Sequence, residues 1–255
     1  MLSKNEVKYY SSLLRKKFRD TENKFLVEGI KIVNEGLLSE FECEIIFVSK
    51  QFNEENKKII SDFQKEKIRF EIIPNSDFLK LIDTVNPQGI AAVFGKLDLK
   101  RKIESDLVVC LDNISDPGNL GTIIRNCDWF GIRELVLINH CADPYNPKAI
   151  RSSMGSIFHL NIFDKIDFEL VFNKLKSAEY DIIYTDTKGQ NIAEYSAYGK
   201  TIVVFSNEAN GPSENIKSIS QKKVTIPKIG NAESLNVASA SAVILHQLTR
   251  ISIEK

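Results

Sequence analysis

The stretch Leu107-Val-Val-Cys-Leu-Asp-Asn-Ile-Ser-Asp-Pro-Gly-Asn-Leu-Gly-Thr-Ile-Ile-Arg-Asn-Cys-Asp-Trp-Phe-Gly131 predicts a strand, a tight turn and a helix in direct succession. Its first five residues are apolar and mostly branched, as in a buried strand. Asp116-Pro-Gly118 predicts the turn, because proline presets φ and glycine accepts backbone angles that other residues avoid. The apolar residues beyond the turn recur at helical spacing, as Leu120, Ile123, Ile124, Cys127 and Phe130.

Two polar side chains make this strand, turn and helix a candidate site. Asn119 lies where the helix begins, and Arg125 lies about two turns into it. Ligands of open α/β sheets bind at the carboxyl ends of strands, which is where this turn falls. A turn and a surface arginine also occur without any ligand, so this stretch alone leaves both interpretations open.

A second polar stretch, Phe205-Ser-Asn-Glu-Ala-Asn-Gly-Pro-Ser213, directly follows the apolar run Thr201–Phe205. A carboxylate as close to a strand end as Glu208 needs a partner, either Arg125 or backbone N–H groups. The alternative is a plain surface loop in which Asn210-Gly211 forms a turn.

The third stretch, Ile226-Pro-Lys-Ile-Gly-Asn-Ala-Glu-Ser-Leu-Asn-Val-Ala-Ser-Ala-Ser-Ala242, ends a predicted strand and begins a helix. Ser234 and Asn236 are both suitable N-cap residues. The small residues 238–242 allow another backbone to approach the helix closely. Three polar turns at three strand ends of one domain therefore predict a shared pocket.

Composition excludes several classes of protein and leaves one local feature. The chain has 255 residues, 43% of them hydrophobic and 27% charged, and its formal net charge is zero. This is an ordinary globular composition with no overall attraction to nucleic acid or anionic membrane. The first 19 residues nevertheless carry six cations, Lys4, Lys8, Arg15, Lys16, Lys17 and Arg19, against Glu6. That excess indicates either a phosphate-binding surface or a solvated helix face.

The cysteines and histidines predict no metal site. The four cysteines lack CxxC spacing and have mostly apolar neighbours, as free thiols in a reducing compartment do, and the three histidines are scattered. No N-terminal signal and no apolar run of membrane-spanning length is present. We therefore expect a soluble cytoplasmic protein that binds neither metal nor membrane.

Alternating strands and helices predict an α/β protein with two domains. Residues 1–96 form a small α/β domain that begins with a basic helix over about residues 1–24, and residues 97–105 form a charged linker. Residues 106–255 form a second domain, whose Val- and Ile-rich strands separated by helices predict a mostly parallel sheet.

The three polar stretches together resemble the three signature motifs of SpoU/TrmH-type RNA methyltransferases of the SPOUT superfamily. The resemblance rests on Asp116-Pro-Gly-Asn-Leu-Gly121 with Arg125, on Asn207-Glu208 with Gly211, and on Ile226-Pro227 with Ser234-Leu-Asn-Val237. It covers about residues 105–255 and implies a SPOUT-type sheet with a deep trefoil knot and a homodimer. Arg15-Lys-Lys-Phe-Arg19 and Phe25-Leu-Val-Glu-Gly29 resemble the ribosomal-protein-like RNA-binding domain that often precedes it.

The resemblance implies S-adenosylmethionine-dependent methylation of a ribose 2′-hydroxyl in RNA. The N-terminal domain favours ribosomal RNA, with transfer RNA as the alternative. Such an enzyme must position two reactants and remove one proton. Carried over from the motifs, the catalytic residues are Arg125, Asn119, Glu208, Ser234 and Asn236. The cofactor-binding residues are Ser206, Asn207, Ile226 and Leu235, and the RNA-binding residues are Arg15, Lys16, Lys17 and Arg19.

Two residues leave alternatives open. The family assigns proton removal to the arginine at the position of Arg125, but a guanidinium normally stays protonated, so Arg125 either acts as the base or binds the adjacent phosphate. Ser206 stands where the family usually has glycine, and its added hydroxyl either crowds the cofactor or replaces a water. A catalytically inactive RNA-binding protein of this fold is therefore the competing hypothesis. A dinucleotide-binding enzyme is disfavoured, because no GxGxxG follows a predicted strand.

Overall fold

The computed structural model describes residues 2–97, 102–164, 166, 168–195, 199–207, 211–220 and 222–253. They form two compact units. The N-terminal unit comprises Met1–Asp98 and Tyr145–Phe158, and the C-terminal unit comprises Leu99–Pro144 and His159–Lys255. The predicted domain over 106–255 thus differs from the structure in one respect, because residues 145–158 pack with the N-terminal unit.

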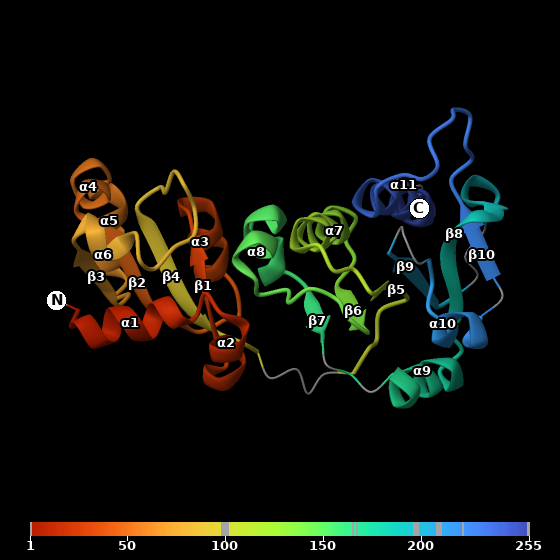
Figure 1. The fold of residues 1–255 in the computed structure, drawn as a ribbon, viewed down its shortest axis with the longest axis horizontal. Coiled ribbons are helices and arrows are strands. Elements are labelled where there is room, and N and C mark those ends of the chain that lie inside the picture. The colour runs from red at the N-terminus through yellow and green to blue at the C-terminus, as the bar shows by residue number, and fades with distance from the viewer. Residues whose placement is uncertain are drawn as a thin grey trace. The chain divides into compact units, whose positions relative to one another are not determined.

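The N-terminal unit contains a four-stranded mixed sheet with the order β1-β4-β2-β3 (Figure 1). Strand β4 runs antiparallel to β1 and β2, whereas β3 is parallel to β2. The strands are β1 (Lys24–Glu28), β2 (Cys43–Ser49), β3 (Phe70–Ile73) and β4 (Ile90–Gly95). The helices are α1 (Lys4–Ser12), α2 (Lys16–Glu22), α3 (Ile30–Leu37), α4 (Lys50–Glu55), α5 (Lys57–Lys65), α6 (Asn75–Phe78), α8 (Pro147–Ser153) and the 3-10 turn η1 (Ser156–Phe158).

The basic N-terminal segment forms two helices where the sequence predicts one. Ser3 caps α1 in a capping box with Glu6, and Val7 and Tyr10 bury the apolar side of α1 in the core of the unit. Helix α2 starts separately after Arg15, whose extended φ of −102° and ψ of 131° interrupt the helical path. The cationic residues are therefore divided between two helices.

The segment 145–158 completes the core of the N-terminal unit. The ring of Tyr145 lies 4.6 Å from that of Phe25, centroid to centroid, and the ring of Phe158 lies 5.1 Å from those of Phe41 and Phe94. Such aromatic pairs contribute beyond the area they bury. This packing explains why a segment from the middle of the chain joins the N-terminal unit.

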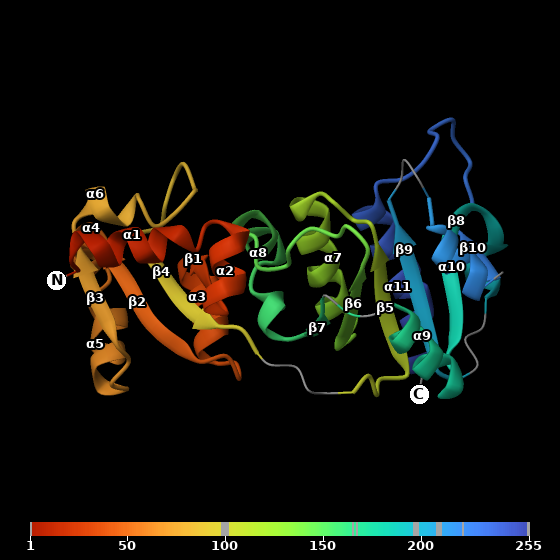
Figure 2. The same cartoon turned by 60° about the horizontal axis from the view of Figure 1, so that its bottom comes forward.

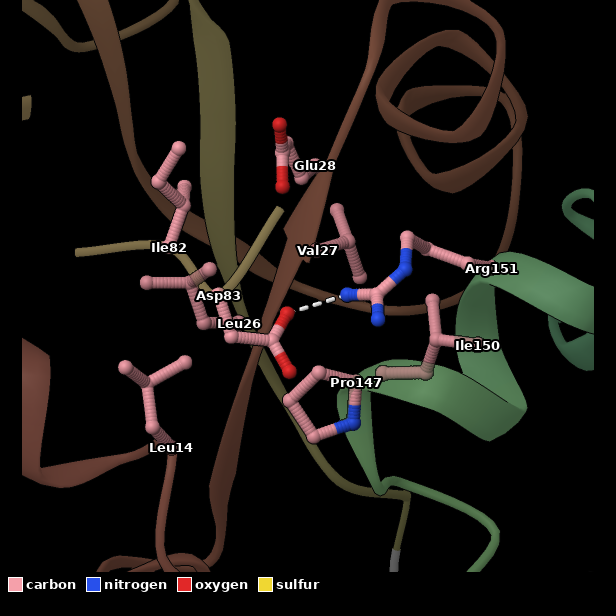
Figure 3. A pocket seen from close by; sticks show the side chains of 9 residues that line it. All are labelled: Leu14, Leu26, Val27, Glu28, Ile82, Asp83, Pro147, Ile150 and Arg151. Atoms are coloured by element: carbon pink, nitrogen blue, oxygen red, sulfur yellow. Dashed lines mark hydrogen bonds and ion pairs between the residues drawn. The ribbon is translucent and has the colours of Figure 1, made fainter. Parts of the chain in front are cut away.

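A polar contact also attaches α8 to the segment after α6, beside strand β1 (Figure 3). Arg151 of α8 forms an ion pair with Asp83, beside the buried Glu28 at the end of β1. Thr84 donates its hydroxyl hydrogen to Glu28 Oε2 over 2.6 Å. Burial raises the pKa of Glu28, since desolvation disfavours a carboxylate.

The C-terminal unit contains a six-stranded sheet with the order β10-β8-β9-β5-β6-β7, in which every pair is parallel. This confirms the predicted α/β class and parallel sheet. The strands are β5 (Leu107–Asp112), β6 (Glu134–Ile138), β7 (Asn161–Phe163), β8 (Asp181–Asn191), β9 (Thr201–Ser206) and β10 (Lys222–Thr225). The helices are α7 (Pro117–Trp129), α9 (Phe168–Ser177), α10 (Glu214–Ile219), α11 (Val237–Ile253) and the 3-10 turn η2 (Ile192–Glu194).

Helices cover both faces of this sheet. Phe172 of α9 and Ile216 of α10 pack on the even-numbered residues of β5 and β9, and α7 and α11 lie together on the other face (Figures 1 and 2). Because the strands are parallel, β5, β9 and β10 all end at the same edge of the sheet. Each of the three polar stretches follows one of these ends.

Three further features concern the described residues only. No helix among them is long and apolar enough to cross a membrane. They contain no cluster of three His, Cys, Asp or Glu side chains that could hold a metal ion. All four cysteines are free thiols, and burial raises the pKa of Cys43 and of Cys141 to about 11.

Candidate active site

The turn after β5 begins α7 with a strong N-terminal cap. Asp116 Oδ1 accepts a hydrogen bond from Asn119 N over 2.8 Å, and Pro117 occupies the first turn, where its missing N–H is not needed. The cap fixes the start of the helix, and with it the position of the Asn119 side chain.

Asn236 joins the first polar stretch to the third. Its Nδ2 donates to Asn119 Oδ1 over 3.0 Å, although 117 residues separate the two in the chain. Its Oδ1 accepts from Ala238 N and Ser239 N over 3.0 and 3.3 Å and so caps α11. Of the two N-cap candidates, Asn236 is therefore the one that caps α11. The two predicted catalytic asparagines are in direct contact.

A second contact between α7 and α11 involves Asn126, which the sequence analysis did not identify. Asn126 lies two turns after Asn119 and on the same side of α7. Its Nδ2 donates to Ala238 O and to Ser241 Oγ, each over 2.9 Å, and Ser241 is fully buried. The small residues of α11 permit this approach. The seven-residue spacing from Asn119 was the signal that could have revealed it.

Arg125 lies exposed on α7. It forms no hydrogen bond or ion pair with any described residue, so its guanidinium is available to an anionic partner. Its predicted partner Glu208 lies outside the described residues.

The second polar stretch begins at the buried end of β9. Ser206 is paired with Asp112 of β5, and Asn207 N donates to the Asp112 carbonyl over 3.2 Å. Ser206 is 8% exposed, and its hydroxyl oxygen has no partner among the described residues. A buried hydroxyl left without a partner costs about 1–3 kcal/mol. A ligand with a hydrogen-bonding group at this strand end would remove that cost.

Asp112 is a polar residue of this edge that the sequence analysis did not identify. Its carboxylate is fully buried and accepts from Ser213 N over 2.7 Å and from the amide of Asn139. The available signal was an acidic residue at the end of an otherwise apolar strand.

The other predicted cofactor and catalytic residues lie on the segment between β10 and α11. Ile226 is half-buried just after β10, Leu235 is 50% exposed, and Ser234 is exposed beside it. These three side chains are near the same edge by topology, and no hydrogen bond joins them to the described parts of the first two stretches.

The four predicted RNA-binding side chains differ in their exposure to solvent. Arg15, Lys16 and Lys17 are exposed. Arg19 is only 2% exposed, and its Nη1 donates to the Leu13 carbonyl over 2.9 Å. This burial disfavours the predicted RNA contact at Arg19, because a guanidinium enclosed by protein offers little surface to a phosphate. Arg19 instead holds the connection between α1 and α2.

Comparison with protein families gives two matches that divide the chain. Residues 106–246 match the SpoU rRNA Methylase family. Residues 4–92 match the MRM3-like substrate binding domain. The first match contains all three polar stretches, and the second contains the exposed cations of α2.

Similar proteins span nearly the whole chain. The 23S rRNA (guanosine(2553)-2′-O)-methyltransferase RlmP of Bacillus subtilis is 34% identical over 254 residues, covering 96% of this chain and 97% of its own. The SpoU methyltransferase AviRb of Streptomyces viridochromogenes, in complex with the cofactor AdoMet, superimposes with a TM-score of 0.87 at 26% identity. A putative RNA methyltransferase of the TrmH family from Porphyromonas gingivalis gives a TM-score of 0.86 at 28% identity. Each of these two structural matches covers 98% of this chain and 99% of the matched chain. With its motif-bearing half and its overall fold both matched, this chain belongs to the SpoU rRNA methylase family.

Proposed function

We propose that this protein transfers a methyl group from S-adenosylmethionine to a ribose 2′-hydroxyl of ribosomal RNA. The observation that carries the proposal is the joining of the first and third polar stretches at one edge of a parallel sheet, with Asn119 bonded to Asn236. Relatives named for 2′-O-methylation of 23S rRNA support the substrate class.

The residues at this edge fit the cofactor. Ser206 presents a buried hydroxyl that bonds to none of the described residues. Asn207 and Ile226 follow the ends of β9 and β10, and Leu235 precedes α11. These four residues hold the cofactor, chiefly through backbone groups. When bound, S-adenosylmethionine supplies a methyl group on a sulfonium, which an oxygen nucleophile can attack in line. The protein must then hold the ribose in place and allow its hydroxyl proton to leave.

Arg125 meets the RNA beside this edge. Its exposed guanidinium is free to pair with a phosphate, for which the planar fork of N–H donors is well suited. We assign it this positioning of the target nucleotide, with the phosphate or a water molecule taking the proton. A direct role as the base is the alternative. Asn119 and Asn236 hold the neighbouring turns, and Glu208 and Ser234 complete the polar lining.

The N-terminal unit recruits the RNA. Arg15, Lys16 and Lys17 place three exposed cations at the start of α2, within the region that matches a substrate binding domain. Phosphate contacts of this kind supply affinity without reading sequence. Ribosomal RNA is the substrate we assign, and the cytoplasm is the compartment, since a bacterial relative over the full chain is named for 23S rRNA.

A second copy of the chain covers the outer surface of α7 and α11. Trp129 is 82% exposed, and Val243 is 41% exposed. Exposed apolar groups of this size on neighbouring helices are typical of an interface. The homodimer and the deep trefoil knot implied by the motifs are both part of the proposal. The chain returns from β10 to α11 over the segment 226–236 (Figure 2).

Methyl transfer from tritiated S-adenosylmethionine to total RNA tests the proposal, with mapping of the modified nucleotide by mass spectrometry. We expect label in ribosomal RNA at a 2′-O position. A wild-type protein that neither binds the cofactor by calorimetry nor labels RNA would contradict the proposal. It would favour an RNA-binding protein without catalysis, in which Ser206 obstructs the cofactor site.

A further inference from the structure

The C-terminal ends of three neighbouring strands meet at one carboxylate. Strand β5 lies between β9 and β6 in the sheet, and Asp112 is its last residue. The Asp112 side chain accepts from Ser213 N over 2.7 Å and from Asn139 Nδ2, and Asn139 directly follows β6. Asp112 thus links β5 to the turns after both of its neighbours.

Both ends of the loop after β9 are held by this single residue. The carbonyl of Asp112 accepts from Asn207 N over 3.2 Å, and its carboxylate accepts from Ser213 N. The loop between these points carries Asn207 and Glu208, which the proposed function assigns to the cofactor and the active site. Asn139 reinforces the attachment through a second hydrogen bond, of 3.4 Å, from its Nδ2 to Ser213 Oγ.

The burial of Asp112 requires an explanation beyond sheet packing. The five preceding residues of β5 are apolar, and an apolar side chain would fill this position without desolvating a charge. Asp112 is nevertheless fully buried, and all its partners are groups of the loop 207–213 or of the turn after β6. A buried charge with these partners holds Asn207 and Ser213 in place, at a cost that an apolar residue would avoid.

We propose that Asp112 and Asn139 are positioning residues that hold Asn207 and Ser213, at the two ends of the stretch after β9, in the positions that cofactor binding requires. This inference rests on the proposed function for the identity of the cofactor. It assigns Asp112 no contact with substrate: the carboxylate acts through the backbone of Asn207 and Ser213.

An exchange of the two side chains tests the proposal. In Asp112→Asn the new amide either turns a donor toward Ser213 N or Asn139 Nδ2, or is met by a flipped Asn139 amide that gives up its bond to Ser213 Oγ, and in each case the charge-assisted bonds of the carboxylate are lost. Adding Asn139→Asp restores the pattern, because the amide at position 112 can then donate to the carboxylate at 139 and accept from Ser213 N. Asn139 has a φ of +55°, and Asp tolerates this region almost as well as Asn does.

Glu134→Gln is the matched control. Glu134 is also a buried carboxylate of this sheet, 4% exposed, that accepts from backbone groups, namely Glu104 N and Ser105 N. It starts β6, and therefore lies at the edge away from the candidate site. The Glu134→Gln variant should lower the thermal midpoint, as Asp112→Asn does, but it should leave the affinity for the cofactor unchanged.

The readouts are the Kd for S-adenosylmethionine by calorimetry and hydrogen exchange of the peptide that contains Ser213. We expect Asp112→Asn to weaken cofactor binding about tenfold and to speed exchange of the Ser213 amide, as loss of one charge-assisted hydrogen bond implies. The double exchange should restore both. An unchanged Kd in Asp112→Asn, an equal loss in Glu134→Gln, or recovery of the thermal midpoint without recovery of the Kd would overturn the proposal.

The exchange measurement separates this proposal from the proposed function. If the wild-type protein binds no S-adenosylmethionine, the proposed function fails, while the protection of the Ser213 amide still decides whether Asp112 holds the loop. Unaltered exchange in Asp112→Asn overturns the positioning role whatever the cofactor.

Discussion

The two sheets of this protein place their polar residues differently. In the C-terminal unit all pairs are parallel, so the turns after β5, β9 and β10 lie at one edge. In the N-terminal unit β4 runs antiparallel to β1 and β2, so that β1, β2 and β3 end at one edge of the sheet and β4 ends at the opposite edge. The cations that we assign to RNA lie there on helix α2 and at its N-cap instead.

This difference shows why one unit can form a site for chemistry and the other a surface for binding. A parallel sheet brings turns that are distant in sequence into one location, as Asn119 and Asn236 demonstrate. In the mixed sheet β4 ends away from the other three strands, and the exposed cations lie on helix α2 and at its N-cap. Changes in the C-terminal unit should therefore alter catalysis or cofactor binding, and changes in the N-terminal unit should alter RNA affinity or stability alone.

The largest effect is expected from Arg125→Ala. Loss of the guanidinium should lower the rate of methyl transfer by about 10²–10³-fold, a magnitude typical of removing one positioned charge. The Kd for S-adenosylmethionine and the thermal midpoint should stay unchanged, because Arg125 is exposed and bonds to no described residue. Single-turnover kinetics and calorimetry measure these quantities. Arg125→Lys retaining most of the rate would argue against bidentate phosphate binding.

Neutralising the α2 cations should affect the RNA alone. Arg15→Gln, Lys16→Gln and Lys17→Gln together should weaken RNA binding and reduce the slope of log K against log salt by about 2–3. Cofactor affinity should not change. The control removes the same charge from exposed lysines of α4 and α5, by Lys50→Gln, Lys57→Gln and Lys58→Gln. Equal salt slopes in both triple variants would contradict a specific role for α2.

Asn236 has two functions that substitution can separate. Asn236→Ser keeps an acceptor that caps α11 but removes the donor to Asn119, so it should lower kcat/KM about tenfold with little change in stability. Asn236→Ala loses both and should also lower the free energy of unfolding by about 1 kcal/mol. Steady-state kinetics beside chemical denaturation would test this. Full activity in Asn236→Ser would mean that the contact with Asn119 only holds the turns.

Ser206→Ala should have opposite effects on stability and on cofactor affinity. Removing a buried hydroxyl that has no partner should stabilise the free protein by about 1 kcal/mol. The same change should weaken binding of S-adenosylmethionine several-fold if the hydroxyl bonds the cofactor. Tighter binding in Ser206→Ala would instead mean that this serine crowds the pocket.

The smallest effect concerns the buried carboxylate of the mixed sheet. Burial raises the pKa of Glu28, so the folded state favours the protonated form. Its contribution to stability is present below the unfolded pKa of about 4.3 and is lost as pH rises through the higher folded pKa. The free energy of unfolding of Glu28→Gln, relative to that of the wild type, should therefore rise between about pH 4 and about pH 7. Urea denaturation of both proteins at these two pH values would measure the change. A constant difference across this range would show that Thr84 and the charge of Arg151 compensate for burial.

Much of the candidate site could be predicted from the sequence because turn and cap residues act locally. Asp116 and Pro117 specify the start of α7 whatever surrounds them, and the apolar strands specify a parallel sheet. The rule that parallel strands end together predicted a shared pocket for the polar stretches, and the hydrogen bond between Asn119 and Asn236 joins two of them. Asp112 was not identified, because the sequence alone does not tell whether an acid at a strand end is solvated or buried.

Tertiary packing decided the features that could not be predicted. Arg19 belongs to the same cationic run as Arg15, but the separate start of α2 turns its side chain into the protein. Residues 145–158 carry no local signal that they complete another unit, because their partners Phe25 and Phe94 are far away in sequence.

The segment 145–158 also sets the order in which the protein can fold during synthesis. Strand β4 ends at Gly95, but the core around Phe25, Phe41 and Phe94 lacks Phe158 until the ribosome has added about 60 further residues. At about 5–20 residues per second this delay lasts several seconds. The N-terminal unit therefore cannot be completed until strands β5 and β6 and helix α7 of the C-terminal unit have been synthesised, and a fragment ending at residue 97 should expose the aromatic surface that Tyr145 and Phe158 cover.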